Sequence, residues 1–220
     1  MRSFSPPEIT RAGVGRILVS PWIVGSPERQ RAAIAATLDE WENHPWPKGF
    51  ISLNCFASSD GSTVLNYAQW TGDEAHQAFV RTARPRLARN IDAVVPGIVR
   101  PGVVRYRLYG GGITSVHQTP GCFVFVDTQA NNPVEARAWV DDAFAALRSQ
   151  GEPVPGLLAT HFHLSGQSAR VFIYTEWTCA EAQIAAAADK RFSWRQVCDF
   201  ARVKPISVNR FHYCSSIVRT

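Results

Sequence analysis

The chain has 220 residues, 45% of them hydrophobic and 19% charged, a composition that supports a sizeable core and excludes a disordered chain. Its formal net charge is +5, but most of the arginines behind this charge are scattered, so we expect no nucleic-acid partner. No apolar run approaches the ~20 residues that span a bilayer and no apolar segment follows the N-terminal methionine, so we expect a cytoplasmic protein with no membrane partner.

In chain order, the first half of the sequence predicts a strand, a helix, a two-stranded hairpin, a second helix and a last strand. These elements are expected at 15–24, 27–43, 49–58 with 63–70, from 73, and at 102–110. Proline at position 27 suits the first turn of a helix, and Asp60-Gly61 is a strong signal for a two-residue hairpin turn. A connection rich in proline and arginine precedes the last strand, and Gly110 to Gly112 are assigned to a linker.

The same order returns in the second half at a constant offset. The segment "VLNYAQW" at 64–70 resembles "VFIYTEW" at 171–177, and the two tryptophans are 107 residues apart (177 − 70 = 107). The corresponding elements are expected at 121–129, 133–149, 156–165 with 169–177, 180–188 and 206–214. The chain is therefore predicted to be duplicated, with a first domain at 1–113 and a second at 114–220.

Each copy reads β-α-β-β-α-β, the split unit of a ferredoxin-like α+β fold with an expected strand order of 4-1-3-2. The helices cover one sheet face, and the other must also be buried. Packing the two halves sheet to sheet would achieve this within one chain. We therefore expect an intramolecular pseudo-dimer that acts as a monomer or forms a further homodimer.

The segment 47–61, "PKGFISLNCFASSDG", followed by "VLNYAQW" and the acidic helix start "TGDEAHQAF", resembles the antibiotic biosynthesis monooxygenase family of the dimeric α/β-barrel group. The likeness is good over about 15–80 and weaker in the second copy, which lacks the aspartate-glycine turn. It implies an intramolecular dimeric α/β barrel and an oxygenase acting on anthrone- or phenol-like polyketides. It also implies molecular oxygen as co-substrate, without metal or tightly bound cofactor. The group also contains haem-degrading enzymes, quinol oxygenases and similar cyclases, so fold is better supported than reaction.

Polar side chains inside buried strands provide the first candidates for catalysis. With the predicted hairpin register, His161 pairs across the strands with Tyr174, as Asn54 pairs with Tyr67 in the first copy. His163 shares the face of His161, because side chains two residues apart in a strand point the same way. A neutral histidine beside a tyrosine can take a proton from a phenol. The alternative is a pair of buried structural histidines.

The pattern His161-x-His163 also suggests a metal site as an alternative, with His212 as a third ligand. In the expected strand order their strands lie three spacings apart, roughly 14 Å. Metal–nitrogen bonds are close to 2 Å, so one half cannot bring the three together and no metal is expected there, while a site shared between halves stays open. His212 remains a candidate base on the last strand.

The resemblance implies that Trp70 lines a ligand cavity between sheet and helices, with Trp177 as its equivalent. The alternative is that both tryptophans only fill the end of the core. A haem-degrading relative would need a histidine on the following helix, where His76 lies closer to Trp70 than that pattern requires and Gln183 replaces it in the second copy. Arg105 on the last strand is a candidate for stabilising a phenolate, or a paired edge charge.

The predicted register places the tryptophans and the histidine–tyrosine pair on opposite sheet faces unless a β-bulge intervenes. The favoured hypothesis is an oxygenase that deprotonates a flat aromatic substrate, stabilises its anion and excludes water. No phosphate-binding loop or dinucleotide fingerprint is present, whereas reduced flavin delivered from solution stays open. A polyketide cyclase or aromatase and a non-catalytic aromatic-ligand-binding protein are the alternatives. The sequence leaves the substrate and the active copy undetermined.

Overall fold

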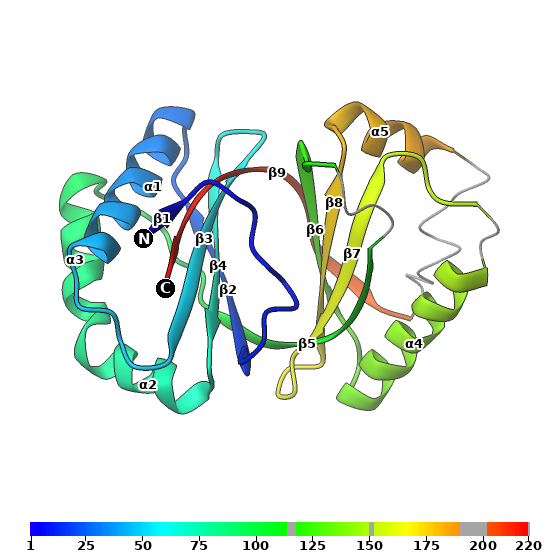
Figure 1. Ribbon diagram of the computed structural model, residues 1–220, viewed down its shortest axis with the longest axis horizontal. Coiled ribbons are helices and arrows are strands. Elements are labelled where there is room, and N and C mark those ends of the chain that lie inside the picture. Colours follow the sequence, from blue (N-terminus) through cyan, green and yellow to red (C-terminus); the bar gives the residue numbers. More distant parts are fainter. Residues whose placement is uncertain (114–117, 150–151, 190–201, 220) are drawn as a thin grey trace. The chain divides into compact units, whose positions relative to one another are not determined.

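The computed structural model describes residues 1–113, 118–149, 152–189 and 202–219. The chain divides into two compact units, the first formed by Met1–Arg105 with His212–Thr220 and the second by Tyr106–Phe211. In each unit, helices cover one face of an antiparallel sheet, as Figure 1 shows. Both units are therefore of the predicted α+β class. Within the described ranges, no helix is long and apolar enough to cross a membrane.

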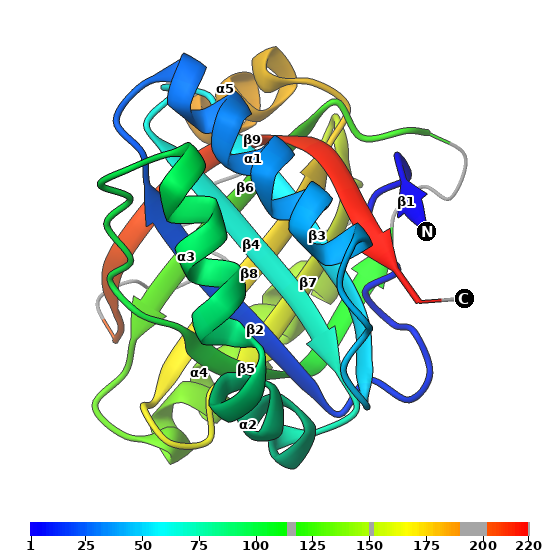
Figure 2. The ribbon, with the colours of Figure 1, turned by 90° about the vertical axis from the view of Figure 1, so that its left-hand side faces the viewer.

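The first unit has its strands in the order β1-β9-β3-β4-β2. Its elements are β1 (Arg2–Ser3), β2 (Arg16–Ile23), α1 (Pro27–Glu42), β3 (Phe50–Ser58), β4 (Thr63–Trp70), α2 (Asp73–Thr82), α3 (Arg84–Val94), the start of β5 (Val104–Ile113) and the end of β9 (Lys204–Val218). Figure 2 shows α1 and α3 lying across the face of β2, β3 and β4. The core of the unit lies between these helices and the sheet.

Helix α1 begins where the sequence predicts it. Ser26 caps the helix by accepting a hydrogen bond from the Arg29 backbone N–H at 3.3 Å, and Pro27 occupies the first turn. Ile34, Leu38 and Trp41 follow at helical spacing and are all buried. This face packs into the core of the unit.

The sequence predicted a proline- and arginine-rich connection after α2. This prediction is wrong, because the segment contains helix α3. Pro85 stands in its first turn, where proline starts a helix rather than breaking one. Leu87 and Ile91, four residues apart, are both buried and belong to the core. Two apolar residues among many arginines are a weak periodic signal, and their burial became visible only with the sheet in place.

The second unit has the strand order β5-β7-β8-β6, with β9 paired to the free edge of β6. Its elements are the main part of β5, β6 (Cys122–Gln129), α4 (Pro133–Ser149), β7 (Leu157–Leu164), β8 (Arg170–Trp177), α5 (Ala180–Ala188) and the first part of β9. The order β7-β8-β6-β9 confirms the expected 4-1-3-2 arrangement for the second copy. The order β3-β4-β2-β5 does the same for the first.

The hairpin registers also confirm the sequence prediction. Asn54 pairs with Tyr67 on β3 and β4, and His161 pairs with Tyr174 on β7 and β8. Each hairpin carries a register shift near its start, between Phe50 and Ser52 in the first unit and between Leu157 and Ala159 in the second. The two hairpins are therefore alike even in their irregularity, as a duplication predicts.

The assignment of Gly110, Gly111 and Gly112 to a linker is wrong. They continue β5 and pair with Phe162, His161 and Thr160 on β7. A Cβ atom on Gly111 would lie 2.3 Å from His161 Nδ1 and 2.9 Å from the Thr160 carbonyl oxygen. Close approach of the histidine ring, rather than a flexible link, therefore explains this glycine. Because β5 and β9 each extend from one unit into the other, the compact units do not coincide with the sequence copies 1–113 and 114–220.

The Gly111→Ala substitution is expected to lower the free energy of unfolding by ~1–3 kcal/mol, the usual cost of overpacking. Gly112→Ala is the matched control, because its added Cβ meets nothing within 4 Å. It should change stability by less than ~0.5 kcal/mol. Urea unfolding of both variants measures the difference, and equal losses would contradict the close-approach explanation.

Candidate functional site

The first unit contains a cavity of about 330 Å³ between its sheet and its three helices. Side chains from β2, β3, β4, α1, α2, α3 and the segment before β5 line it. Small-molecule sites in proteins occupy roughly 300–1,000 Å³. The cavity is thus large enough for a ligand of a few fused rings.

Aromatic side chains form much of the cavity wall. Trp41 on α1, Trp70 at the end of β4 and Phe79 on α2 are mutually close, with ring centroids 5.1 to 6.4 Å apart. Trp22 on β2 lines another part of the cavity. Flat aromatic walls favour a flat aromatic ligand, because stacked and edge-on ring contacts stabilise beyond simple area burial.

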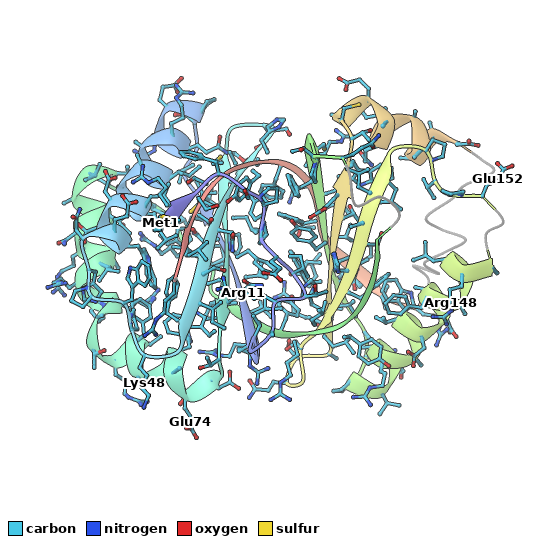
Figure 3. All side chains as sticks on the ribbon, in the orientation of Figure 1. Met1, Arg11, Lys48, Glu74, Arg148 and Glu152 are labelled. Carbon is cyan, nitrogen blue, oxygen red and sulfur yellow. The ribbon has the colours of Figure 1, made fainter. Side chains whose placement is uncertain are left out.

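Three polar side chains line this cavity, two of them side by side at one end. Asn66 lies four residues before Trp70 on β4, so both side chains face the helices. His76 on α2 points inward and its ring lies edge-on to Trp70, with centroids 5.3 Å apart. Glu74, two residues earlier, points away from the unit, as Figure 3 shows. The start of α2 therefore carries the imidazole to the end of β4.

The same three side chains each keep a polar atom without a partner. Asn66 Nδ2, Trp70 Nε1 and His76 Nδ1 are buried and form no hydrogen bond with any described residue. Buried polar groups in native proteins are nearly always satisfied by protein, water or ligand. Three such atoms on the wall of one cavity indicate positions at which polar groups of a ligand can bind.

His76 is held in its neutral form. Burial is the main cause, and the nearby positive charges of Arg105 and Arg84 add to it, so that its pKa is lowered to about 4 despite the opposing charge of Asp73. At neutral pH one ring nitrogen therefore carries a free lone pair. That nitrogen can accept a hydrogen bond or a proton.

Arg105 lines the cavity, as its proposed role in stabilising a phenolate requires. Its Nε lies 3.9 Å from Asp73 Oδ1, and Asp73 also pairs with Arg16. Both sequence interpretations of this arginine therefore stay predictions. It is a loosely paired charge, and it lies close enough to His76 to affect its pKa.

Two of the three histidines expected to act in catalysis, His161 and His163, lie in the second unit, whereas the cavity lies in the first. His161 and His163 are buried, and burial lowers their pKa values to about 4 and about 3. The His161 ring lies 5.9 Å from that of Tyr174, and His163 Nδ1 lies 3.1 Å from the Phe172 carbonyl oxygen. The Tyr174 hydroxyl donates to Glu176 at 3.1 Å. The His163 ring is therefore bonded locally, whereas His161 Nδ1 is buried and has no hydrogen-bond partner among the described residues.

Asn54 and Tyr67 face away from the cavity. The amide of Asn54 donates to Ser52 Oγ at 3.0 Å and to the Tyr67 carbonyl at 3.1 Å. The bulge at the start of β3 does not bring these two side chains to the face of Trp70. The Asn54–Tyr67 pair and Trp70 therefore lie on opposite faces of the sheet.

His212 on β9 is exposed, with Nε2 3.4 Å from Ser59 Oγ. In the described ranges, no group of three or more His, Cys, Asp or Glu could hold a metal ion.

The second unit lacks the polar cavity end in its described residues. At the 107-residue offset, the equivalents of Asn66, Ala68, Trp70 and His76 are Ile173, Thr175, Trp177 and Gln183. The Trp177 N–H donates to Thr175 Oγ1 at 2.9 Å, whereas the Trp70 N–H has no described partner. The duplicated tryptophans therefore differ in what surrounds them, since the Trp70 N–H is left without a described partner at the cavity of the first unit.

Sequence reasoning missed Asn66, Arg84 and Arg100. Asn66 could have been found, because a polar residue on the strand face of Trp70 is unusual in a buried sheet. Arg84 begins α3 and Arg100 lies in the segment between α3 and β5, and the apolar pattern of this helix is weak. Their position at the cavity follows from tertiary packing.

The group that the sequence resembles includes haem-degrading enzymes, so haem is a ligand to consider for this cavity. The residues of the cavity fit haem poorly. His76 is the sole histidine on the described cavity wall, and its ring is flanked by Trp70 and by Phe79, whose centroid is 6.2 Å away. An iron ligand needs a ring nitrogen facing open, planar space. The cavity volume of about 330 Å³ also lies at the lower end of the range for ligand sites, and a porphyrin is a large ligand.

No protein-family model and no curated protein sequence matches the chain. Solved structures do. An anthrone oxidase-like protein is 13% identical, with a TM-score of 0.67 over 92% of this chain and 93% of its own. A candidate monooxygenase from Fusobacterium nucleatum subsp. nucleatum is 11% identical, with a TM-score of 0.57 over 93% and 94%. A monooxygenase from the gene ActVA-Orf6 of Streptomyces coelicolor, in complex with nanaomycin D, is 30% identical over 50% of this chain and 100% of its own, with a TM-score of 0.42.

The two full-length likenesses confirm the expected fold. The chain shares the fold of these structures, with two ferredoxin-like β-α-β-β-α-β halves. At these identities the likeness concerns the fold, and the chemistry must be argued from the cavity.

The His76 imidazole is expected to stay neutral well below pH 6, because burial and the nearby arginines disfavour its charged form and lower its pKa to about 4. In a ¹⁵N NMR titration from pH 7.5 to 5.0, its ring signals should not move. Their absence from a His76→Gln spectrum assigns them. A titration midpoint near the ordinary value of ~6.5 would contradict the buried, cation-flanked position.

Proposed function

We propose that the protein is an oxygenase that acts on a flat polycyclic phenol or anthrone bound in the cavity of the first unit. The observation that carries this proposal is the presence of Trp70 Nε1 and His76 Nδ1 side by side on an aromatic cavity wall that Asn66 Nδ2 also lines, all three without described partners. A neutral imidazole with a hydrogen-bond donor beside it suits the removal of a proton from a phenol or an activated carbon. The fold shared with an anthrone oxidase-like protein supports this chemistry by analogy.

In this mechanism the substrate lies between the aromatic walls with its acidic group against His76. The neutral imidazole accepts the proton, and the Trp70 N–H beside it donates a hydrogen bond to the oxygen anion that forms. The Asn66 amide, farther along β4, is available to a second polar group of the ligand. Arg105 adds a positive charge near the same point. A lowered pKa makes His76 a weak base in the empty cavity, but the adjacent substrate anion offsets this, because an opposite charge favours the protonated imidazole.

The deprotonated, electron-rich ring then transfers an electron to molecular oxygen, and the two radicals combine at the activated carbon. For an anthrone, one oxygen atom becomes the new carbonyl, and the other leaves as water with the two hydrogens of the methylene carbon. Four electrons leave the substrate and four reduce O2. The protein binds, deprotonates and shields the anion from water. Reduced flavin delivered from solution is the alternative electron source.

Oxygen uptake by the chelator-treated protein, measured with a panel of anthrones and polycyclic phenols, tests the reaction. The expected result is uptake with one ¹⁸O atom from labelled O2 in the product. A product formed equally well under nitrogen would indicate a cyclase on the same scaffold. Tight binding without turnover would indicate a binding protein. If oxygen uptake requires added reduced flavin, the flavin and not the substrate anion supplies electrons to O2, and the direct mechanism is wrong.

The duplicated tryptophans allow a matched test of which unit is active. Trp70→Phe removes the N–H that faces the cavity and is expected to lower kcat/KM by about 10²-fold, as loss of an anion-stabilising donor does. Trp177→Phe instead removes the hydrogen bond to Thr175 Oγ1. It should lower stability by a further ~1 kcal/mol relative to Trp70→Phe while leaving kcat/KM unchanged.

Steady-state kinetics and urea unfolding of both variants separate these effects. Loss of activity in Trp177→Phe with an active Trp70→Phe would move the site to the second unit. Equal losses in both variants would show that the tryptophans act only as core residues.

A further inference from the structure

A second polar group faces the cavity of the first unit at a different place from His76. Arg100 follows α3, and its side chain is only 16% exposed. Its guanidinium lies over the Trp22 ring, 4.4 Å from the centroid, and Nη1 lies 2.8 Å from Asp92 Oδ1. Its Nε and Nη2 atoms are buried, and no residue of the described chain accepts a hydrogen bond from either. Buried N–H donors of a charged group are costly without hydrogen-bond acceptors, so these two atoms indicate that a ligand supplies the acceptors.

The unpaired atoms form one edge of the guanidinium. Nε–H and the adjacent Nη2–H point in the same direction, and this is an edge that binds a carboxylate through two parallel hydrogen bonds. Asp92 holds the group at Nη1, and Trp22 supports its face. Trp22 is itself fixed, because its Nε1 donates to Ser20 Oγ at 3.1 Å. Arg100 is therefore held in place with a free two-pronged edge.

This edge and the His76 end lie at opposite ends of the cavity. In the antiparallel ladder of β2 and β4, Trp22 pairs with Val64 and Arg16 pairs with Trp70, so six residues separate the two pairs. At ~3.3 Å per residue the backbone positions are ~20 Å apart, a gap that the long Trp and Arg side chains shorten. A ligand that reaches both ends must be elongated.

The charge of the cavity wall also favours an anion. Arg84, Arg100 and Arg105 line it, and no acidic residue does so in the described part of the chain. Asp92 and Asp73 pair with two of these arginines without lining the cavity themselves. A low-dielectric cavity lined by one sign of charge attracts the opposite charge.

We propose that the substrate carries a carboxylate at the end remote from its reacting ring, and that Arg100 binds it through Nε and Nη2. The position of the reacting ring rests on the proposed function, whereas carboxylate recognition requires no turnover. The substrate class is thus a multi-ring aromatic acid. Arg100 sets specificity for it, and the groups around His76 act on the other end.

A matched pair of ligands tests this assignment, anthraquinone-2-carboxylate and its methyl ester, which differ in charge but hardly in shape. Tryptophan fluorescence quenching measures their dissociation constants with the full chain. The wild-type protein should bind the acid about ten- to a hundredfold more tightly than the ester, the range expected for hydrogen bonds to a charged group. Arg100→Gln should abolish this preference and leave ester binding unchanged.

Two further variants make the test specific. Arg100→Lys keeps the charge but loses the two-pronged edge, so it should retain only a small part of the preference. It also serves if Arg100→Gln does not fold. Arg31→Gln removes an exposed arginine on α1, 70% accessible and paired with Glu28, and should keep the full preference.

Equal binding of acid and ester by the wild-type protein, or a preference that survives in both Arg100 variants, would overturn the proposal. His76→Gln separates it from the proposed function, because this variant should lose turnover yet keep the preference for the acid. If the wild-type protein shows the preference but no oxygen uptake with any substrate, the oxygenase proposal fails and the carboxylate site stands.

Discussion

The alternation of side chains along β4 is the constraint on which the site depends. The hairpin register pairs Asn54 with Tyr67, and this sends Asn66 and Trp70 toward the helices while Tyr67 faces the other way. A shift of one residue would reverse every one of these directions. The hairpin turn at Asp60-Gly61, which fixes this register, therefore decides which polar groups line the cavity.

The two copies show how one backbone plan yields different sites. Their hairpins share register and bulges, yet the first copy leaves polar atoms open on the cavity wall where the second satisfies or replaces them. Changing Ala68 to the threonine of the second copy would by itself offer the tryptophan N–H a partner. A duplicated fold can thus keep one half for structure and the other for chemistry with few substitutions, because a buried polar group is either paired or available.

Charge organises the cavity at its two ends in different ways. Near His76, burial together with the charges of Arg105 and Arg84 lowers the pKa of the imidazole, and the two arginines favour an anion beside it. At the other end, Arg100 is held by Asp92 and Trp22 and keeps one edge free. Both effects require removal from water, since exposed charges at these distances would be screened. Helix α3 and the segment after it therefore matter as much for the electrostatics of the cavity as for its closure.

The sequence by itself determined the duplication, the order of the elements, the hairpin registers and the α+β fold, because these follow from local periodicity, turn chemistry and a repeated pattern. It also identified Trp70, His76 and Arg105, though without showing that they meet. Only the tertiary structure decided that α3 exists, that the three glycines continue β5 beside His161, and that the cavity with its arginines lies in the first unit. These features depend on contacts between residues far apart in the chain, which local patterns do not encode. The buried histidines of β7 show the same limit, since a sequence records their chemistry but not whether a cavity reaches them.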